Sequence, residues 1–201
     1  MSCFRPHFRF SEQELKGTLG GTSTMYIVPG MKLIPQQRTG SCWYACAQML
    51  IHWRQERSQM SHLGLIPPEL DAECQRLLDK NSGITNPQIV PMAKRLGLEV
   101  IPPMSIERSN LRDLLKTYGP LWVNGVKHIT VIAGVYKYSP KWEARQILMY
   151  DPSPVGVGKV GWFNFQMRYE QGSAWHPDRR DTHPSVEATF LHCPQVYQPK
   201  Y

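Results

Sequence analysis

The chain has 201 residues, 41% of them hydrophobic, and a formal charge of +7 from 23 Lys and Arg against 16 Asp and Glu. This length and composition predict a globular domain with a sizeable core and exclude a disordered or collagen-like chain. No run approaches the roughly 18 apolar residues of a membrane span, and the first ten residues lack the apolar core of a secretory signal. We therefore expect no membrane association and no cleaved signal peptide.

Residues 1–33 are expected to form an N-terminal arm or lead-in, and residues 34–201 a single domain. Within the lead-in, Met25, Tyr26, Ile27 and Val28 predict a short strand that ends at Pro29 and Gly30.

Four helices are predicted between about residues 41 and 118. The first follows an N-cap at Ser41, because Cys42, Cys46, Met49 and Trp53 recur at helical spacing. The other three are expected over about residues 68–80, 86–96 and 105–118, where proline or serine opens the pattern and glycine follows two of them.

After Pro120 the pattern changes to short runs rich in β-branched and aromatic residues. Strands are predicted over residues 121–123, 128–138, 146–150, 160–165 and 186–192. A helical half followed by an antiparallel half predicts an α+β fold, with a cleft where the halves meet.

Three stretches contain residues suited to cysteine chemistry. Cys42 falls in the first turn of the long helix, where the helix dipole favours a negative sulfur, and Gln36 precedes it by six residues. His128 opens an apolar strand after a glycine-containing turn, so its ring can face the cleft. Asp151, at a strand end 23 residues later, can accept an imidazole N–H and fix the tautomer.

In order and context, Gln36-x5-Cys42-Trp43, Gly125-x2-His128 and Asp151-Pro152 resemble the papain-like cysteine peptidases. The similarity covers roughly residues 31–155 and is closest to the compact bacterial branch, which includes plant-pathogen effectors and double-glycine leader peptidases. The resemblance implies that Cys42 is the nucleophile, His128 the general base and acid, and Asp151 the group that orients the imidazole. It further implies that Gln36 and the backbone N–H of Cys42 form the oxyanion hole.

The resemblance also implies a function: a cysteine endopeptidase that requires no cofactor. We expect a toxin-like effector that cleaves a protein inside another cell, and a competing bacterium is one candidate for that cell. In the producer, an immunity protein is expected to neutralise the effector. Cleavage after small residues, Gly-Gly among them, follows from the likeness to leader peptidases. The producer would hold the protein in its cytoplasm and deliver it without a cleaved signal.

Other assignments remain open at this point. The oxyanion donor could shift to Gln37, and Asn164 is a second candidate for orienting the imidazole. The five cysteines are odd in number and lack C-x-x-C spacing, which favours reduced thiols and no metal site. Cys46 and Cys74 lie on apolar helix faces and are expected in the core. No role is expected for five other histidines, which are predicted to lie at the surface or to cap helices: His52, His62, His176, His183 and His192.

Two other functions compete with proteolysis. A deamidase or transglutaminase would use the same triad on glutamine side chains, since both reactions pass through a thioester. A non-catalytic module would instead keep Cys42 structural and use the positive charge to bind nucleic acid, with an affinity that falls steeply with salt.

Overall fold

The computed structural model of the chain describes residues 25–66, 68–102, 104, 108–125, 128–136, 146–164 and 188–197. The predicted arm up to residue 24, and His176 and His183, lie outside these residues. The elements of the described chain, in order, are β1 (Met25–Ile27), α1 (Cys42–Arg57), η2 (Ser61–Leu63), η3 (Pro68–Leu70), α2 (Ala72–Lys80), α3 (Asn86–Arg95), β2 (Glu99–Ile101), α4 (Arg108–Tyr118), β3 (Leu121–Val123), β4 (Thr130–Tyr136), β5 (Gln146–Asp151), β6 (Lys159–Asn164) and β7 (Phe190–His192).

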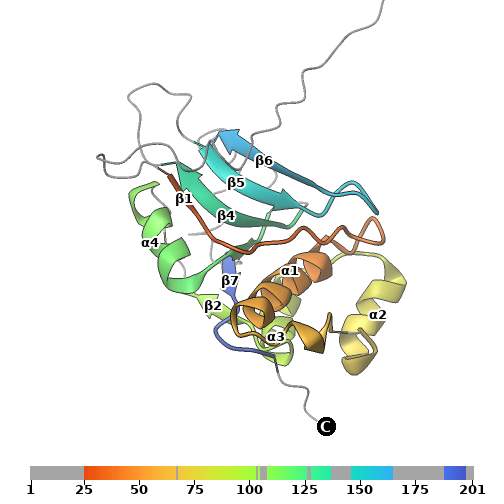
Figure 1. Cartoon of the computed structure of the whole chain (residues 1–201). Helices are drawn as coiled ribbons and strands as arrows, with labels where there is room; N and C mark the ends of the chain where they lie inside the picture. The colour runs from red at the N-terminus through yellow and green to blue at the C-terminus, as the bar shows by residue number, and fades with distance from the viewer. Residues whose placement is uncertain are drawn as a thin grey trace, which may run out of the picture.

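The strands form one antiparallel sheet in the order β2-β7-β3-β4-β5-β6, and β1 pairs with β4 outside this path. β1 and β3 share one edge of β4: β1 pairs with its last three residues, and β3 with its first three. β5 occupies the other edge of β4 and continues into β6 through a hairpin. Figure 1 shows β4, β5 and β6 side by side, with α1, α2 and α3 grouped away from them and α4 next to β1.

Neighbouring residues of the central strands enter two different cores, as the alternation of side chains along a strand requires. Trp122 and Val131 pack with residues of α1, α2 and α3. Leu121, Val123 and Ile132 belong to a second cluster that contains the apolar residues of α4. The sheet is therefore covered by helices on both faces.

Helix α1 is buried on nearly all sides, because the sheet covers one side and the other helices and loops cover the rest. Two contacts tie it to the sheet half: the indole N–H of Trp122 donates to the carbonyl of Trp43 at 3.1 Å, and the Cys46 thiol donates to the carbonyl of Ile129 at 3.3 Å. These contacts fix the position of the helix against the segment that precedes β4.

The α+β class predicted from the sequence is confirmed by the helices and the antiparallel sheet. Strands nevertheless come from both halves of the chain. The end of the predicted lead-in supplies β1 and the buried side chain of Val28, and residues 99–101 form an unpredicted edge strand that pairs with β7. The short strands predicted near residues 25–28 and at 121–123 are thus confirmed as β1 and β3, whereas β2 was missed and is stabilised by its pairing with β7.

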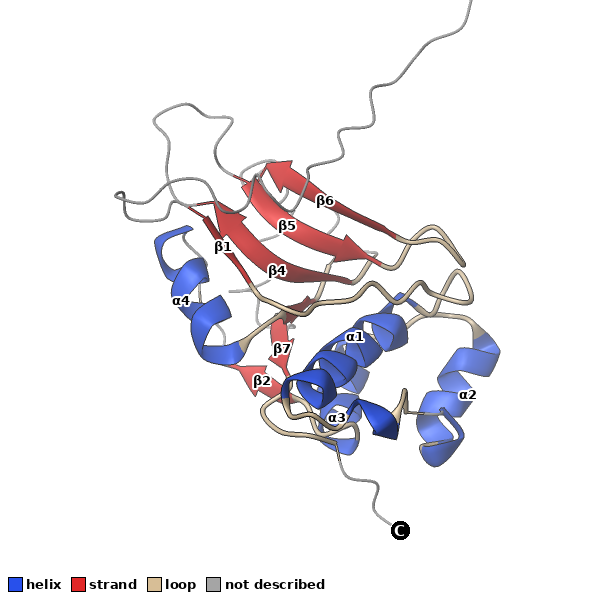
Figure 2. Ribbon diagram, in the orientation of Figure 1, coloured by secondary structure: helices blue, strands red, loops and turns tan. Residues whose placement is uncertain are grey.

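Among the predicted helix starts, that of the second helix is wrong, and that of the fourth falls on residues 105–107, outside the described residues. Residues 68–70 form a separate 3₁₀ turn, and α2 begins after Asp71, whose carboxylate accepts the backbone N–H of Cys74 at 2.8 Å. Helix α4 is described from Arg108. The extended segment that links β1 to α1 crosses between the strands and the helices (Figure 2).

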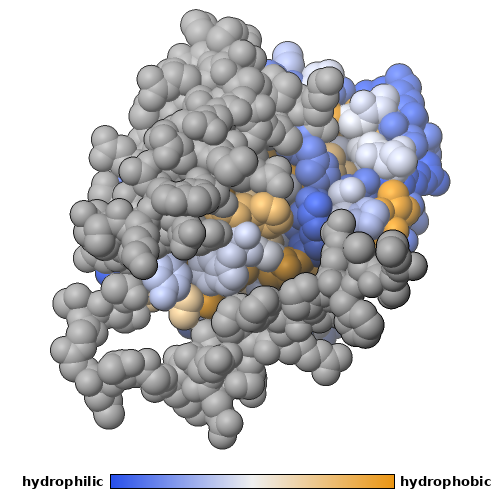
Figure 3. All heavy atoms as spheres, turned by 90° about the horizontal axis from the view of Figure 1, so that it is seen from above, coloured by the Kyte–Doolittle hydropathy of each residue, from blue (hydrophilic) through white to orange (hydrophobic). Residues whose placement is uncertain are grey.

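On the described surface, apolar and hydrophilic areas lie next to each other in the view from above (Figure 3). Large hydrophobic side chains are exposed at Leu63, Leu65, Leu70, Tyr136, Val155, Val157 and Val160. None of the helices in the described part of the chain is both long and apolar enough to cross a membrane.

Candidate active site

Cys42 is the first residue of α1, and its side chain is buried. Ser41 occupies the N-cap position, as predicted, but its side chain makes no capping hydrogen bond. Instead its hydroxyl donates to the carbonyl of Arg38 at 2.9 Å and accepts the backbone N–H of Arg38 at 3.0 Å. The serine therefore closes the turn before the helix and leaves the amide groups of the first turn without a side-chain cap.

His128 and Asp151 meet because β4 and β5 are antiparallel. His128 lies two residues before β4 and Asp151 ends β5, and the ladder that pairs Val131 with Tyr150 brings these two ends together. Nε2 of His128 lies 2.6 Å from Oδ1 of Asp151. The backbone N–H of Ser153 donates to the same carboxylate oxygen at 2.9 Å.

The thiol of Cys42 lies close enough to the ring of His128 to help raise the pKa of the ring. Since Nε2 is already bonded to Asp151, Nδ1 is the nitrogen available to the sulfur. Both Cys42 and His128 line a cavity of about 440 Å³, together with Ser82, Gly83, Ile84, Thr85, Asn86, Asn124, Gly125 and Ile129. The described residues thus bring a thiol and an imidazole to the wall of one cavity, with a carboxylate bonded to the imidazole. The cavity is large enough for part of a peptide.

The surroundings of His128 and Asp151 favour the charged form of both. Burial opposes the charge on the His128 ring, but hydrogen bonds to Asp151 and Cys42 outweigh it and raise its pKa to about 9. Burial likewise opposes the charge on Asp151, but the hydrogen bonds from His128 and the Ser153 N–H lower the pKa of its carboxyl. At neutral pH the pair is therefore an imidazolium and a carboxylate.

Gln36 is buried in the segment that leads to α1. Its backbone N–H donates to the carbonyl of Pro152 at 3.0 Å, and its carbonyl accepts the N–H of Gly156 at 2.9 Å, so it is joined to the loop that follows Asp151. Its side-chain Nε2 donates to the carbonyls of Arg38 and Thr39 at 2.9 and 3.1 Å, and its Oε1 has no partner among the described residues. The amide can therefore serve an oxyanion only by exchanging one of these bonds.

Asn81 joins the segment before Cys42 to one wall of the cavity. Its Oδ1 accepts the N–H of Gly40 at 2.8 Å, and its Nδ2 donates to the hydroxyl of Thr39 at 3.0 Å. A Cβ at Gly40 would collide with the carbonyl oxygen of Asn81, which explains the glycine. The cavity wall at residues 82–86 is thus held directly against the turn that carries Cys42.

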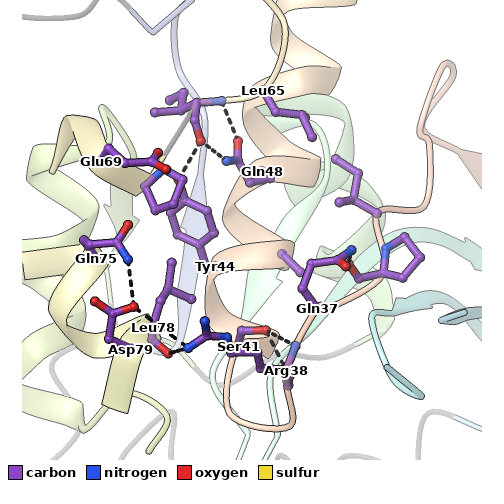
Figure 4. Close-up of a pocket in the computed structure, with 15 residues that line it drawn as sticks. Gln37, Arg38, Ser41, Tyr44, Gln48, Leu65, Glu69, Gln75, Leu78 and Asp79 are labelled. Atoms are coloured by element: carbon purple, nitrogen blue, oxygen red, sulfur yellow. Dashed lines mark hydrogen bonds and ion pairs between the residues drawn. The ribbon is translucent and has the colours of Figure 1, made fainter. Parts of the chain in front are cut away.

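Gln37, the other candidate for the oxyanion donor, lines a different cavity. This second cavity, of about 470 Å³, lies between α1, the segment before it and α2 (Figure 4). The Gln37 amide donates to the carbonyl of Pro35 at 3.3 Å. Cys42 does not line this cavity, which argues against Gln37 as the oxyanion donor, and Gln36 lines neither of the two cavities.

Asn164 is not the neighbour of His128. In the β5–β6 ladder it pairs with Gln146, at the opposite end of the hairpin from Asp151. Five residues of extended strand separate the two positions, roughly 16 Å along β5. Of the two sequence candidates, the structure therefore brings only Asp151 to the histidine.

Among the other sequence candidates, Cys46 and Cys74 are buried in the core, as predicted. Burial raises the pKa of both thiols, that of Cys74 to about 12. The surface position predicted for His192 is wrong: its ring is buried on β7, 4.6 Å between centroids from that of Tyr118, because the edge strand β2 covers it. In the described part of the chain no group of three His, Cys, Asp or Glu residues can hold a metal ion.

The sequence reasoning missed two residues that contact this site. Asn81 carries a local signal, since an asparagine in the left-handed conformation commonly ends a helix, as it does after α2. Lys159, whose Nζ lies 3.2 Å from Oδ2 of Asp151, carries none, because only strand pairing brings it there.

Comparison with known proteins places the chain in a family. A family model described as papain-like cysteine protease AvrRpt2 matches residues 23–170, about three quarters of the chain. No curated protein matches the sequence. The chain therefore belongs to this family of papain-like cysteine proteases and is a cysteine peptidase, a hydrolase.

Proposed function

We propose that the chain is an endopeptidase in which Cys42 is the nucleophile, His128 the general base and acid, and Asp151 the residue that orients the imidazole. One observation carries the proposal: Nε2 of His128 lies 2.6 Å from Oδ1 of Asp151, and His128 and Cys42 line the same cavity. The family match independently supports cysteine proteolysis. The proposed arrangement is papain-like, with the nucleophile on the helical half and the histidine and aspartate on the sheet half.

In the first half of the reaction, His128, an imidazolium at neutral pH, already holds the proton of the Cys42 thiol, and the sulfur attacks the carbonyl carbon of a peptide bond. The carbonyl oxygen becomes an oxyanion. When the tetrahedral intermediate collapses, the C–N bond breaks and His128 donates its proton to the departing amine. The product is a thioester on Cys42, and Asp151 keeps the ring of His128 oriented throughout.

In the second half, His128 takes a proton from water, which attacks the thioester. Collapse of this intermediate breaks the C–S bond, releases the new carboxyl terminus and restores the starting state, in which His128 holds the proton. The backbone N–H of Cys42 and the amide of Gln36 would stabilise both oxyanions. For Gln36 this requires the exchange of one of its bonds to the carbonyls of Arg38 and Thr39.

The biological setting is part of the proposal. We infer a toxin-like effector that acts on a protein inside another cell, with an immunity protein in the producer. The proposed cleavage after small residues, Gly-Gly among them, rests on the likeness to leader peptidases.

Alkylation by iodoacetamide at about pH 6, followed site by site by mass spectrometry, tests the triad. Cys46 is an internal control, since it lies one helical turn from Cys42 and burial raises its pKa. Cys42 should react and Cys46 should not, and His128→Asn should slow the reaction at Cys42 at least tenfold. Equal reactivity of Cys42 in wild type and His128→Asn would contradict the proposal.

The reaction itself is tested by comparing protein termini in cells that express wild type or Cys42→Ala. New termini that require Cys42 are expected, and their sequences report the cleavage motif. A deamidase would proceed through the same thioester. It would, however, leave its targets intact and raise their mass by about one dalton per site. The absence of Cys42-dependent termini would refute proteolysis of proteins in those cells.

A further inference from the structure

The carboxylate of Asp151 has a partner on each oxygen. Oδ1 accepts from the His128 ring and from the backbone N–H of Ser153. Oδ2 lies 3.2 Å from the ammonium group of Lys159. The side chain of Asp151 is mostly buried, whereas that of Lys159 is about half exposed, at 12% and 53% of their accessible areas. The lysine thus approaches the carboxylate from the solvent side, opposite the histidine.

The hairpin between β5 and β6 places Lys159 at this oxygen. Asp151 and Lys159 are directly paired residues at the end of the ladder. The chain turns back through residues 154–158, where the N–H of Gly158 donates to the carbonyl of Pro154 at 2.8 Å. Gly158 has φ +62°, and a Cβ there would lie 3.0 Å from the carbonyl oxygen of Asp151. A glycine at this position therefore lets the turn pass close to Asp151.

The contact between Lys159 and Asp151 places a positive charge close to the catalytic groups. His128 lies between Cys42 on α1 and Asp151 on β5. The negative charge of Asp151 also contributes to the raised pKa of Cys46 on α1. Among the described residues that face this group, Lys159 on β6 brings the one positive charge besides the imidazolium. An uncompensated carboxylate holds the imidazolium proton firmly, whereas a general acid and base works best when it releases its proton near the working pH.

We propose that Lys159 is a positioning residue of the catalytic centre: its ammonium group holds Oδ2 of Asp151 and partly offsets the carboxylate charge, so that His128 can release its proton during the reaction. This inference rests on the proposed function, since it concerns the same histidine. Lys159 itself does not reach the substrate or the reacting atoms and acts only through Asp151.

The test is an NMR titration of histidine side chains in the full chain, labelled with ¹³C at histidine. His128→Asn identifies the His128 signal by its loss. We compare wild type with Lys159→Met, which removes the charge, and with Lys159→Arg, which keeps it. Lys32→Met is the matched control, because Lys32 also forms an exposed ion pair, 3.0 Å from Glu56, on another part of the molecule.

The proposal predicts that the pKa of His128 rises by about half a pH unit in Lys159→Met, as expected for a unit charge lost several ångströms away and screened nearly as strongly as in bulk water, since Lys159 is about half exposed. The pKa should stay within about 0.2 pH unit of wild type in Lys159→Arg, because the charge is kept. It should also stay within about 0.2 pH unit in Lys32→Met, because that charge is distant and screened. A purely structural role of the lysine would not raise this pKa. An unchanged or lower pKa in Lys159→Met overturns the proposal.

Asp151→Asn separates the two proposals. If Asp151 orients and charges His128, this variant should lower the pKa of His128 towards its ordinary value of 6.5. A drop in Asp151→Asn with no change in Lys159→Met would reject the role of Lys159 alone. No change in Asp151→Asn would instead reject the triad, and with it the proposed function.

Discussion

The protonation of His128 makes the stability of the fold depend on pH in a direction that can be worked out. Burial opposes the charge of the ring, but the hydrogen bonds to Asp151 and Cys42 raise its pKa from 6.5 to about 9. A group whose pKa is higher in the folded state binds its proton more tightly there and so stabilises the fold. This stabilisation is complete below pH 6.5 and is lost as the pH rises through about 9.

The size of the effect follows from the same values. A rise in pKa from 6.5 to about 9 corresponds to about 3.5 kcal/mol at most, since each pKa unit is worth about 1.4 kcal/mol. Cys42 supplies part of this rise and titrates itself, so the cleaner protein is Cys42→Ala, which also prevents proteolysis during the measurement. In that background we expect about 1 to 2 kcal/mol to remain, contributed by Asp151.

Urea unfolding between pH 5.5 and 9.5 measures this contribution. The perturbation is Asp151→Asn in the Cys42→Ala background, which keeps the shape of the side chain and an acceptor oxygen but removes the charge. The difference in unfolding free energy between the two proteins should be largest below pH 6.5 and should shrink by about 1 to 2 kcal/mol by pH 9.5. A difference that does not vary with pH would refute the assignment of a raised pKa to the His128–Asp151 pair.

Two further predictions concern the fold. Gly119 and Gly30 both have φ +80°, but a Cβ at Gly119 would collide with the ring of Trp53, whereas a Cβ at Gly30 meets nothing within 4 Å. In urea unfolding, Gly119→Ala should therefore cost about 1 to 3 kcal/mol more than Gly30→Ala, and equal costs would show that the indole moves freely. Asp71→Ala removes the acceptor of the Cys74 N–H at the start of α2 and should cost about 1 kcal/mol relative to Asp71→Asn, which keeps a capping oxygen; identical melting temperatures would contradict this role.

Much of the candidate site could be predicted because its signals are local. The start of α1 at Cys42 follows from helical periodicity, and the spacing to Gln36 lies within one segment. The α+β class follows from the change of pattern at Pro120. Local signals predicted a strand at residues 25–28 but not its pairing with β4, and they missed β2, because the partner strand decides where such short strands pair.

The sequence by itself determined which residue types are available: a cysteine at a helix start, a histidine before one apolar strand and a carboxylate after the next. The tertiary structure decided which of them meet. The register of β5 against β4 and β6 selects Asp151 over Asn164 and brings Lys159 to the same carboxylate, and the covering strand β2 buries His192. Strand register depends on packing and turn geometry across the whole sheet, and a shift by a single residue would turn these side chains to the opposite face.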